Sequence, residues 1–418
     1  MRERFRKVEG SCQGQHPPIA LRGMKPLDRN PVPPSWTGRK TACLAVLGTC
    51  LSLMPMVAQA DPLPMPAMDG PLVSASPIPL AAGPLGNLEL TGVVSGLGIW
   101  QAHPSLGSES APWGISNSQV FLQKTHGLVQ FYLEAGAYEI PALGTPILSP
   151  GSTLSEDYGA VPEAYLKIVP GPQLSILVGK IPTLAGAEYT FTFENLNIQR
   201  GLLWNQENAV TRGIQANYHN GPMRVSLSWN DGFYSGRFNW LAGELSFAFP
   251  GGSSVTFVGM GNLGSTRYES ASTPLDQNNG AIYNFIYTDV SGPWIVQPYL
   301  QYTRVPRNAA LGIEHGAATR GAALLTGYRL TPEVTFAFRG EYLASTGDPQ
   351  SGAPNLVYGP GSRAWSITFT PTYQYHDFFA RAEFSYVRAI NFSSGDAFGR
   401  AGAASSQSSI LVESGFFF

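Results

Sequence analysis

Residues 363–389 read RAWSITFTPTYQYHDFFARAEFSYVRA and predict two β-strands joined by a short turn at residues 375–377. In the first strand, large apolar side chains alternate with small or hydroxyl-bearing ones, which is the period of a strand with two different faces. The apolar positions are Trp365, Ile367, Phe369, Pro371 and Tyr373, and the others are Ala364, Ser366, Thr368, Thr370 and Thr372. The stretch therefore predicts one hairpin of a sheet that is apolar on one side and polar on the other.

Sixteen segments with this character fill the chain from residue 88 to the C-terminus. The connectors after even-numbered segments are tight turns such as Pro170-Gly171-Pro172, whereas the connectors after odd-numbered segments are longer. This sorting is typical of a bacterial outer-membrane barrel, which has short turns in the periplasm and long loops outside the cell. We therefore predict an all-β fold, a transmembrane antiparallel β-barrel of about 16 strands. The expected strands cover approximately residues 88–100, 117–124, 128–138, 161–169, 173–181, 210–218, 223–231, 240–249, 254–262, 280–289, 294–304, 319–329, 333–343, 363–374, 378–389 and 409–418.

Outward-facing aromatic residues gather at two levels of the expected strands. Two such levels are the aromatic girdles that a barrel places at the membrane interfaces. A soluble secreted sandwich or solenoid is the structural alternative, because its sheets also alternate. The aromatic residues near the short turns are Trp294, Tyr218, Phe249 and Tyr373, and those near the long loops are Tyr302, Tyr342, Trp365 and Tyr386.

The last strand ends on an aromatic residue. Ile410, Val412, Phe416 and the terminal Phe418 share one face, and this pattern resembles the C-terminal signal of outer-membrane β-barrels. We therefore predict that Phe416 and Phe418 form the membrane-assembly signal. Outer-membrane lipid and the barrel-assembly machinery are the partners expected from it, and the bacterial outer membrane is the expected location.

Residues 1–60 have the layout of an N-terminal extension followed by a cleaved signal peptide. Arg39 and Lys40 precede an apolar run that ends in Ala58-Gln59-Ala60, a small-residue cleavage site. The exported chain is therefore expected to begin at Asp61.

A proline-rich stretch, residues 61–87, follows the expected cleavage site. This composition cannot form a core and predicts an extended periplasmic tail, which we interpret as a plain spacer before a barrel at residues 88–418. The start codon is open between Met1 and Met24.

The charge of the exported chain argues against nucleic acid as a partner, and its cysteine content excludes disulfides and thiolate metal sites. Nine of the 26 basic residues and three of the 28 acidic ones precede Asp61, so the exported chain has 17 basic and 25 acidic residues and a formal charge of −8. This negative charge argues against nucleic acid as a partner. Cys12, Cys43 and Cys50 also precede Asp61, so the exported chain has no disulfide and no thiolate metal site.

No motif in the chain predicts catalysis, a cofactor or a metal site. The sequence GMGNLG at residues 259–264 matches the spacing of a dinucleotide-binding loop, but no apolar helix follows it. No expected strand supplies a histidine base. The five histidines after Asp61 fall in short turns (His126, His219 and His376) or in long loops (His103 and His315).

Charged residues are expected on the inward face of the barrel. A charge inside a soluble core is costly, whereas in a water-filled lumen it stays solvated and influences which solutes pass. We therefore interpret this set as the wall of a pore. Its members are Glu134, Glu163, Lys167, Arg224, Glu244, Arg339, Glu341, Arg381 and Glu383.

The longest connector combines aromatic and charged residues. It runs from Ile181 to Asn208, with residue 209 as its outer limit. We predict that it folds into the barrel as a constriction loop, with its acidic residues facing the wall arginines across a transverse field. The alternative is an external flap in which the aromatic residues pack on one another. The residues expected at the constriction are Glu188, Tyr189, Glu194, Arg200, Trp204 and Glu207.

The region around this connector resembles a known family, the outer-membrane β-barrel porins described as OmpL-like. The resemblance implies a barrel and passive transport over the whole exported chain, and it carries over no catalytic residue. The segments that carry it are Gly186-Ala187-Glu188, Glu194-Asn195, Arg200-Gly201-Leu202-Leu203-Trp204, Arg212-Gly213 and Trp229-Asn230-Asp231-Gly232-Phe233-Tyr234.

The predicted function is a porin-like channel for passive diffusion of small hydrophilic solutes, without enzymatic activity. The alternatives are a non-conducting barrel that acts as an adhesin or receptor through its long loops, or a barrel enzyme. Porins of this size often form homotrimers, and the sequence shows no subunit interface. The transported solute and the ion selectivity do not follow from the residues.

Overall fold

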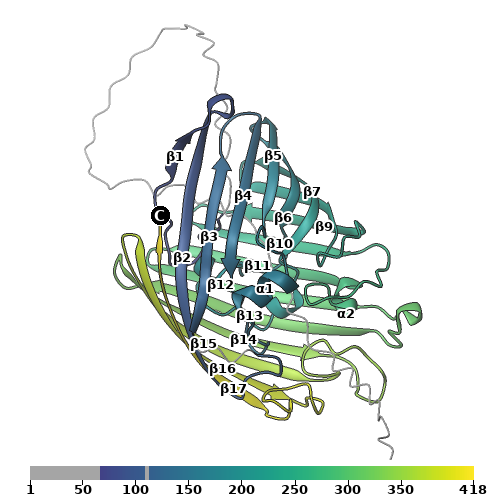
Figure 1. Ribbon diagram of the computed structural model, residues 1–418. Coiled ribbons are helices and arrows are strands. Elements are labelled where there is room, and N and C mark those ends of the chain that lie inside the picture. Colours follow the sequence, from purple (N-terminus) through teal and green to yellow (C-terminus); the bar gives the residue numbers. More distant parts are fainter. Residues whose placement is uncertain (1–65, 109–112) are drawn as a thin grey trace, which may run out of the picture.

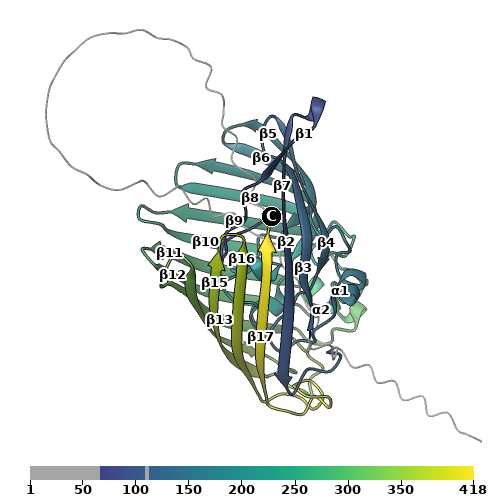
Figure 2. The same ribbon diagram turned by 60° about the vertical axis from the view of Figure 1, so that its left-hand side comes forward.

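The computed structural model describes residues 66–108 and 113–418 (Figure 1). Sixteen antiparallel strands, β2 to β17, form a closed barrel in which each strand pairs with its neighbour in the sequence and β17 returns to pair with β2. Figure 2 shows β17 beside β2 where the barrel closes. The predicted all-β barrel of 16 strands is confirmed. The predicted signal peptide, residues 1–60, lies outside the described residues.

The strand boundaries agree with the expected ones to within a few residues. The main difference is β3, which begins at residue 113 instead of 117, because it stays paired with β2 through a bulge at Ser95 and Gly96. The barrel strands are β2 (Asn87–Ala102), β3 (Trp113–Lys124), β4 (Val129–Tyr138), β5 (Ala164–Gly171), β6 (Leu174–Pro182), β7 (Val210–Asn220), β8 (Met223–Asn230), β9 (Trp240–Ala248), β10 (Ser253–Asn262), β11 (Ala281–Ser291), β12 (Trp294–Val305), β13 (Ala317–Arg329), β14 (Val334–Ser345), β15 (Arg363–Tyr375), β16 (Phe378–Ile390) and β17 (Ser406–Phe417).

The two faces of the barrel wall differ as the alternation predicts. Leu227 and Trp229 of β8 point outward and are 56% and 54% exposed, while Thr368 and Thr370 of β15 point inward and are buried. A band of exposed large apolar side chains is unfavourable in water and is typical of a surface that meets lipid.

A short strand, β1 (Ile78–Ala81), and the C-terminus lie along the same edge of β2, at one end of the barrel. Strand β1 pairs with residues 87–90 of β2 and continues the edge of β2 on which β17 ends. The terminal Phe418 exchanges two backbone hydrogen bonds with Gly92, and its ring lies where a side chain at Gly92 would be. Part of the predicted spacer is therefore a strand of the sheet, because β1 satisfies backbone groups of β2 that β17 leaves unpaired.

The remaining elements are short and lie in connectors. None of the helices in residues 66–108 and 113–418 is long and apolar enough to cross a membrane. The helices are α1 (Pro150–Glu156) and α2 (Leu275–Asn278), with single 3₁₀ turns η1 (Gly83–Leu85), η2 (Thr192–Glu194), η3 (Trp204–Gln206) and η4 (Ala309–Leu311).

Candidate pore constriction

The connector between β6 and β7 lies inside the barrel, and we call its residues 183–209 the constriction loop. It contacts the inward face of strands β14, β16 and β17 on the far side of the wall. All six residues expected at the constriction are buried, and none is more than 6% exposed: Glu188, Tyr189, Glu194, Arg200, Trp204 and Glu207.

Arg339 of β14 is the centre of one contact between wall and loop. Its guanidinium group forms an ion pair with Glu188 of the loop, and its Nε lies 3.2 Å from Oε2 of Glu341 on the same strand. It also donates a hydrogen bond of 2.7 Å to the carbonyl of Gln199. The sequence predicts that the acidic loop residues face the wall arginines across a transverse field. This prediction is wrong for Arg339 and Glu188, because the two side chains are in direct contact and neutralise each other.

Arg381 of β16 forms a second contact, with the loop backbone. Nη1 donates to the carbonyl oxygen of Thr192, and Nη2 donates to those of Asn195 and Leu196, each at 2.8 Å. Oε2 of Glu413 on β17 lies 3.7 Å from Nη1 and balances the charge. One guanidinium group therefore binds three carbonyl groups around the turn η2. Hydrogen bonds from a charged donor are stronger than those between neutral groups.

Wall carboxylates bind backbone N–H groups of the loop. Glu383 accepts hydrogen bonds from the N–H groups of Ile198 and Gln199, and Oε1 of Glu341 accepts one of 3.2 Å from Leu203. A buried loop has no regular ladder for its backbone donors, so each would be costly without such a partner. The wall charges thus support the fold of the loop itself.

Gly201 sits where a larger residue would not fit. A Cβ atom at this position would lie 2.2 Å from Oε1 of Glu341 and 2.8 Å from Oε2 of Glu188. The N–H group of Gly201 donates to that same Oε2 at 2.8 Å. The close approach of backbone to carboxylate explains why glycine stands here.

Aromatic contacts hold the loop to the other part of the wall. Phe191 packs on Tyr138 of β4 with ring centroids 5.1 Å apart, and Phe193 packs on Phe121 of β3 at 5.9 Å and on Phe417 of β17 at 6.0 Å. All of these rings are buried. The loop is therefore fixed by apolar burial on one side and by charged groups on the other.

Arg200 is fully buried in the loop, and a second connector contacts it. Its backbone N–H donates to the carbonyl of Pro141, and its carbonyl accepts from the N–H of Leu143, so the connector between β4 and β5 also enters the lumen. The guanidinium group lies 5.9 Å from the ring of Trp204. Among the described residues its three nitrogen atoms have no hydrogen-bond partner.

The other predicted wall residues lie on the lumen side of the remaining strands. Glu134 of β4 accepts hydrogen bonds from Gln119 and Tyr132, and Glu163 is buried just before β5. Lys167 (β5), Arg224 (β8) and Glu244 (β9) lie along the same inner face. Glu413 is an inward residue that sequence reasoning missed, although it alternates with the outward Ile410, Val412 and Phe416.

Residues 66–73, which we call the tail segment, lie against the constriction loop from the end of the barrel that carries the C-terminus. The N–H of Ala67 donates to Oε1 of Glu194 at 3.1 Å, and the N–H of Gly70 donates to the carbonyl of Glu194 at 3.0 Å. Val73 exchanges two hydrogen bonds with the amide of Gln374 on β15, and Leu72 is buried. The plain-spacer interpretation is wrong for this segment, because long-range partners satisfy its backbone.

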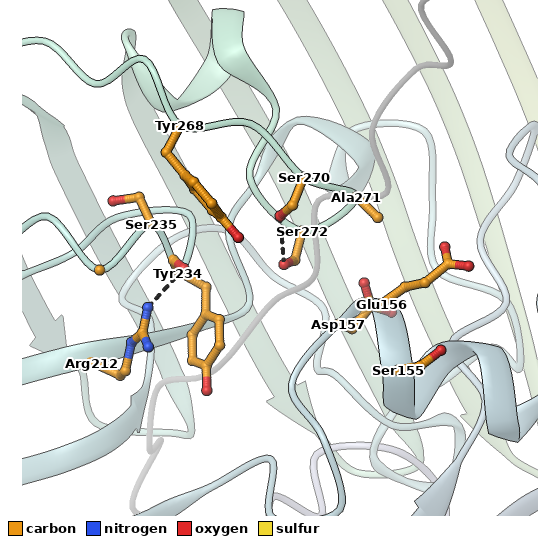
Figure 3. Close-up of a pocket in the computed structure, with 11 residues that line it drawn as sticks. Ser155, Glu156, Asp157, Arg212, Tyr234, Ser235, Tyr268, Ser270, Ala271 and Ser272 are labelled. Carbon is orange, nitrogen blue, oxygen red and sulfur yellow. Dashed lines mark hydrogen bonds between the residues drawn. The ribbon is translucent and has the colours of Figure 1, made fainter.

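A hollow of about 660 Å³ opens among the long loops (Figure 3). Glu156 and Asp157 lie on one side of it, and Arg212 lies on the other, stacked 3.9 Å above the ring of Tyr234 and paired with Asp231 at 2.7 Å. Oδ1 of Asp157 is buried without a hydrogen-bond partner in the described part of the chain. Burial raises the pKa of this carboxyl well above its ordinary value, and the charge of Glu156 raises it further.

Three solved structures share this fold at low sequence identity. Outer-membrane expressed OmpT of Vibrio cholerae matches with 10% identity and a TM-score of 0.53, over 82% of this chain and 100% of that one. The outer membrane channel DcaP of Acinetobacter baumannii matches with 10% identity and a TM-score of 0.53, over 79% and 97%. An anion-selective porin from Comamonas acidovorans matches with 10% identity and a TM-score of 0.51, over 79% and 99%.

No curated protein sequence matches the chain. A family model does: the family described as "Putative beta-barrel porin-2, OmpL-like" matches residues 87–418, which run from the first barrel strand to the C-terminus. The resemblance seen around the constriction loop is confirmed. The chain therefore belongs to this family and is a porin-like channel of the bacterial outer membrane.

Proposed function

We propose that the barrel lets small hydrophilic solutes diffuse passively across the outer membrane, and that it acts without catalysis. The observation that carries this proposal is the constriction loop, which crosses the lumen and is held there by Arg339 and Arg381. A loop fixed at both walls narrows the passage, so only small solutes would pass.

The inner surface supports hydrophilic solutes as the class that passes. Four inward residues of β15 bear hydroxyl groups, and the inward residues of β14 and β16 include two arginine and two glutamate residues. These groups bind the loop, whereas Asn217, Arg224 and Ser226 face the lumen and are partly exposed, so they can offer hydrogen bonds that replace part of a solute's hydration. An apolar solute would form no favourable interaction with these polar groups.

The tail segment adds a second narrowing on the periplasmic side. Its hydrogen bonds to Glu194 and to Gln374 support this proposal, because they hold it against the loop and the wall. We propose that loop and tail together set the width of the channel. Removal of either one then widens the passage.

Partners of the barrel form part of the same proposal. Phe416 and Phe418 are exposed on the outer face, where the barrel-assembly machinery and then outer-membrane lipid would meet them. An in-vitro folded OmpT of Vibrio cholerae has been described in a trimer form, and we propose a homotrimer for this chain. Light scattering of the purified protein would give its mass, and a monomer would contradict that part.

Single-channel recording tests the function. Purified, folded barrel in a planar bilayer should give discrete conductance steps, and liposomes that contain it should release small neutral sugars. Circular dichroism and heat-dependent migration in gels confirm the fold of the same sample. A folded barrel that gives no conductance steps and no release would contradict the channel and favour a receptor or adhesin.

A further inference from the structure

Four arginines lie on the outer face of the sheet between β12 and β16, at the strand ends that lead into the long loops. We call them the arginine rim. Each lies an even number of positions from the outward-facing residues of its own strand, so it shares their face, and each is exposed. They are Arg304 of β12, Arg320 of β13, Arg363 of β15 and Arg388 of β16.

Strand register brings the four side chains together. Arg320 lies opposite Ala344 of β14, which in turn lies opposite Arg363. Because neighbouring strands are about 4.8 Å apart, the backbones of Arg320 and Arg363 are about 10 Å apart, with only a methyl group between them.

Diagonal positions complete the cluster. Arg320 faces Tyr302, so Arg304 is its diagonal neighbour, and Arg388 faces Trp365, so Arg363 is its diagonal neighbour. Diagonal neighbours of this kind are about 7–8 Å apart, within reach of long side chains. The rim is therefore one continuous cationic surface.

The rim lies at a defined depth in the membrane. Directly next to it on the outer face are Tyr302, Tyr342 and Trp365, and Trp365 packs on Tyr386 with ring centroids 5.3 Å apart. Aromatic residues of this kind mark the interface between hydrocarbon and headgroups. Long loops face the cell exterior, so the arginines lie at the headgroup level of the outer leaflet.

Nothing in the described chain neutralises the rim. Its four guanidinium groups have no ion-pair or hydrogen-bond partner among residues 66–108 and 113–418. Two other outward cations are satisfied: Lys180 donates to the carbonyls of Tyr158 and Val161, and Arg212 pairs with Asp231. An anion from outside the protein would therefore stabilise the arginine rim.

We propose that the arginine rim binds the phosphate groups of lipopolysaccharide, the phosphorylated glycolipid of the outer leaflet. Guanidinium groups bind phosphate bidentately, and a pair of sites about 10 Å apart suits a headgroup with two phosphates better than a single ion. A second copy of the chain fits less well, because Asp289, the outward strand carboxylate of the described residues, lies at the opposite end of its strand. The binding is independent of conductance.

A quadruple variant tests the proposal: Arg304→Ala, Arg320→Ala, Arg363→Ala and Arg388→Ala in the full exported chain. Lipopolysaccharide bound to purified barrel is counted by native mass spectrometry and titrated in mixed vesicles. The variant should lose at least tenfold in affinity. Dephosphorylated lipopolysaccharide should bind the unaltered protein as weakly as the intact lipid binds the variant. Arg329→Ala is the matched control, an exposed arginine at the opposite end of β13.

A lysine variant distinguishes bidentate phosphate binding from simple charge attraction. Replacing the four arginines by lysine keeps the charge and the fold but removes bidentate contacts, so it should bind with intermediate affinity. If the alanine variant does not fold, Arg304→Ala with Arg388→Ala takes its place. Unchanged binding by a folded variant, or equal competition by inorganic phosphate, would overturn the proposal. So would a changed oligomeric state with unchanged lipid binding, which would assign the rim to a subunit contact.

Discussion

Arg339 of β14 and Glu188 of the constriction loop form an ion pair in the barrel interior, although 151 residues separate them in the sequence. Both side chains are buried, and Glu341 lies on the other side of the same guanidinium group. This ion pair is one of the contacts that hold the loop against β14.

Arg339→Met should release the loop and lower the free energy of unfolding. Removing one partner of a buried ion pair leaves an uncompensated charge and costs about 3–5 kcal/mol. Denaturant titration measures the loss, and single-channel recording should show larger and noisier steps. Adding Glu188→Gln to Arg339→Met should restore part of the stability. If the free energy of unfolding falls in the double variant by the sum of the losses in the two single variants, the two residues do not act as a pair.

Deletion of Thr183 to Asn205 should raise conductance severalfold and weaken selectivity, because the deletion removes the segment that crosses the lumen. Ion flux through a planar bilayer and the size limit for sugar release measure the two effects. A barrel that remains folded and conducts as before would mean that the loop does not restrict the path.

Gly70→Val should displace the tail segment and leave the loop in place. A Cβ atom at Gly70 would lie 2.4 Å from the carbonyl oxygen of Asn195, so the two backbones must separate. We expect a rise in conductance and faster proteolysis of the tail, with little change in barrel stability. Gly171→Ala is the control, since a Cβ atom there meets nothing within 4 Å. Equal behaviour of the two variants would argue against a narrowing role for the tail.

Arg224→Glu should shift ion preference toward cations without releasing the loop. Arg224 lies on the inner face of β8 and is only partly buried, whereas Arg339 and Arg381 are committed to loop contacts. The reversal potential in a salt gradient measures the shift. Charge reversal at Arg381, by contrast, should destabilise the loop, because three carbonyl groups lose their donor. An unchanged reversal potential in Arg224→Glu would remove this residue from the path.

The stability of the connector between β4 and β5 should depend on pH through Asp157 at the hollow between the loops. Burial raises the pKa of this carboxyl, so the neutral form is favoured in the folded connector. This stabilisation is complete below the ordinary aspartate pKa and is lost as pH rises through the raised value. Limited proteolysis of residues 150–160 between pH 5 and 9 measures this: cleavage should increase as pH rises, and Asp157→Asn should flatten the curve. Persistence of the full pH effect in that variant would assign it to another group.

The barrel itself was predictable because its signals are local. Alternation in residues such as 363–375 depends only on which neighbours share a face, and each tight turn forces the next strand to pair antiparallel with the last one. The outward aromatic residues and the Phe418 terminus add to the same conclusion. Boundaries were missed mainly at β3, where glycine and serine weaken the local pattern and pairing with β2 decides.

The partners of the charged residues were not predictable. Alternation placed Arg339, Arg381 and Glu383 on the inner face, yet it could not show that they bind the loop, because the residues concerned are 140 to 189 positions apart. The same holds for the tail segment, whose proline content predicts an extended chain but not its contacts with Glu194 and Gln374.

The sequence by itself determined the strands, their order, the lipid-facing surface and the position of the longest connector, since these follow from period-two alternation and turn length. Only the tertiary structure decided that this connector and the tail segment lie inside the barrel, and that Arg320 and Arg363 share one row on the outer face. The physical reason is that barrel closure and register bring together groups that are far apart in the chain, and buried charges and backbone donors then select the partners that satisfy them.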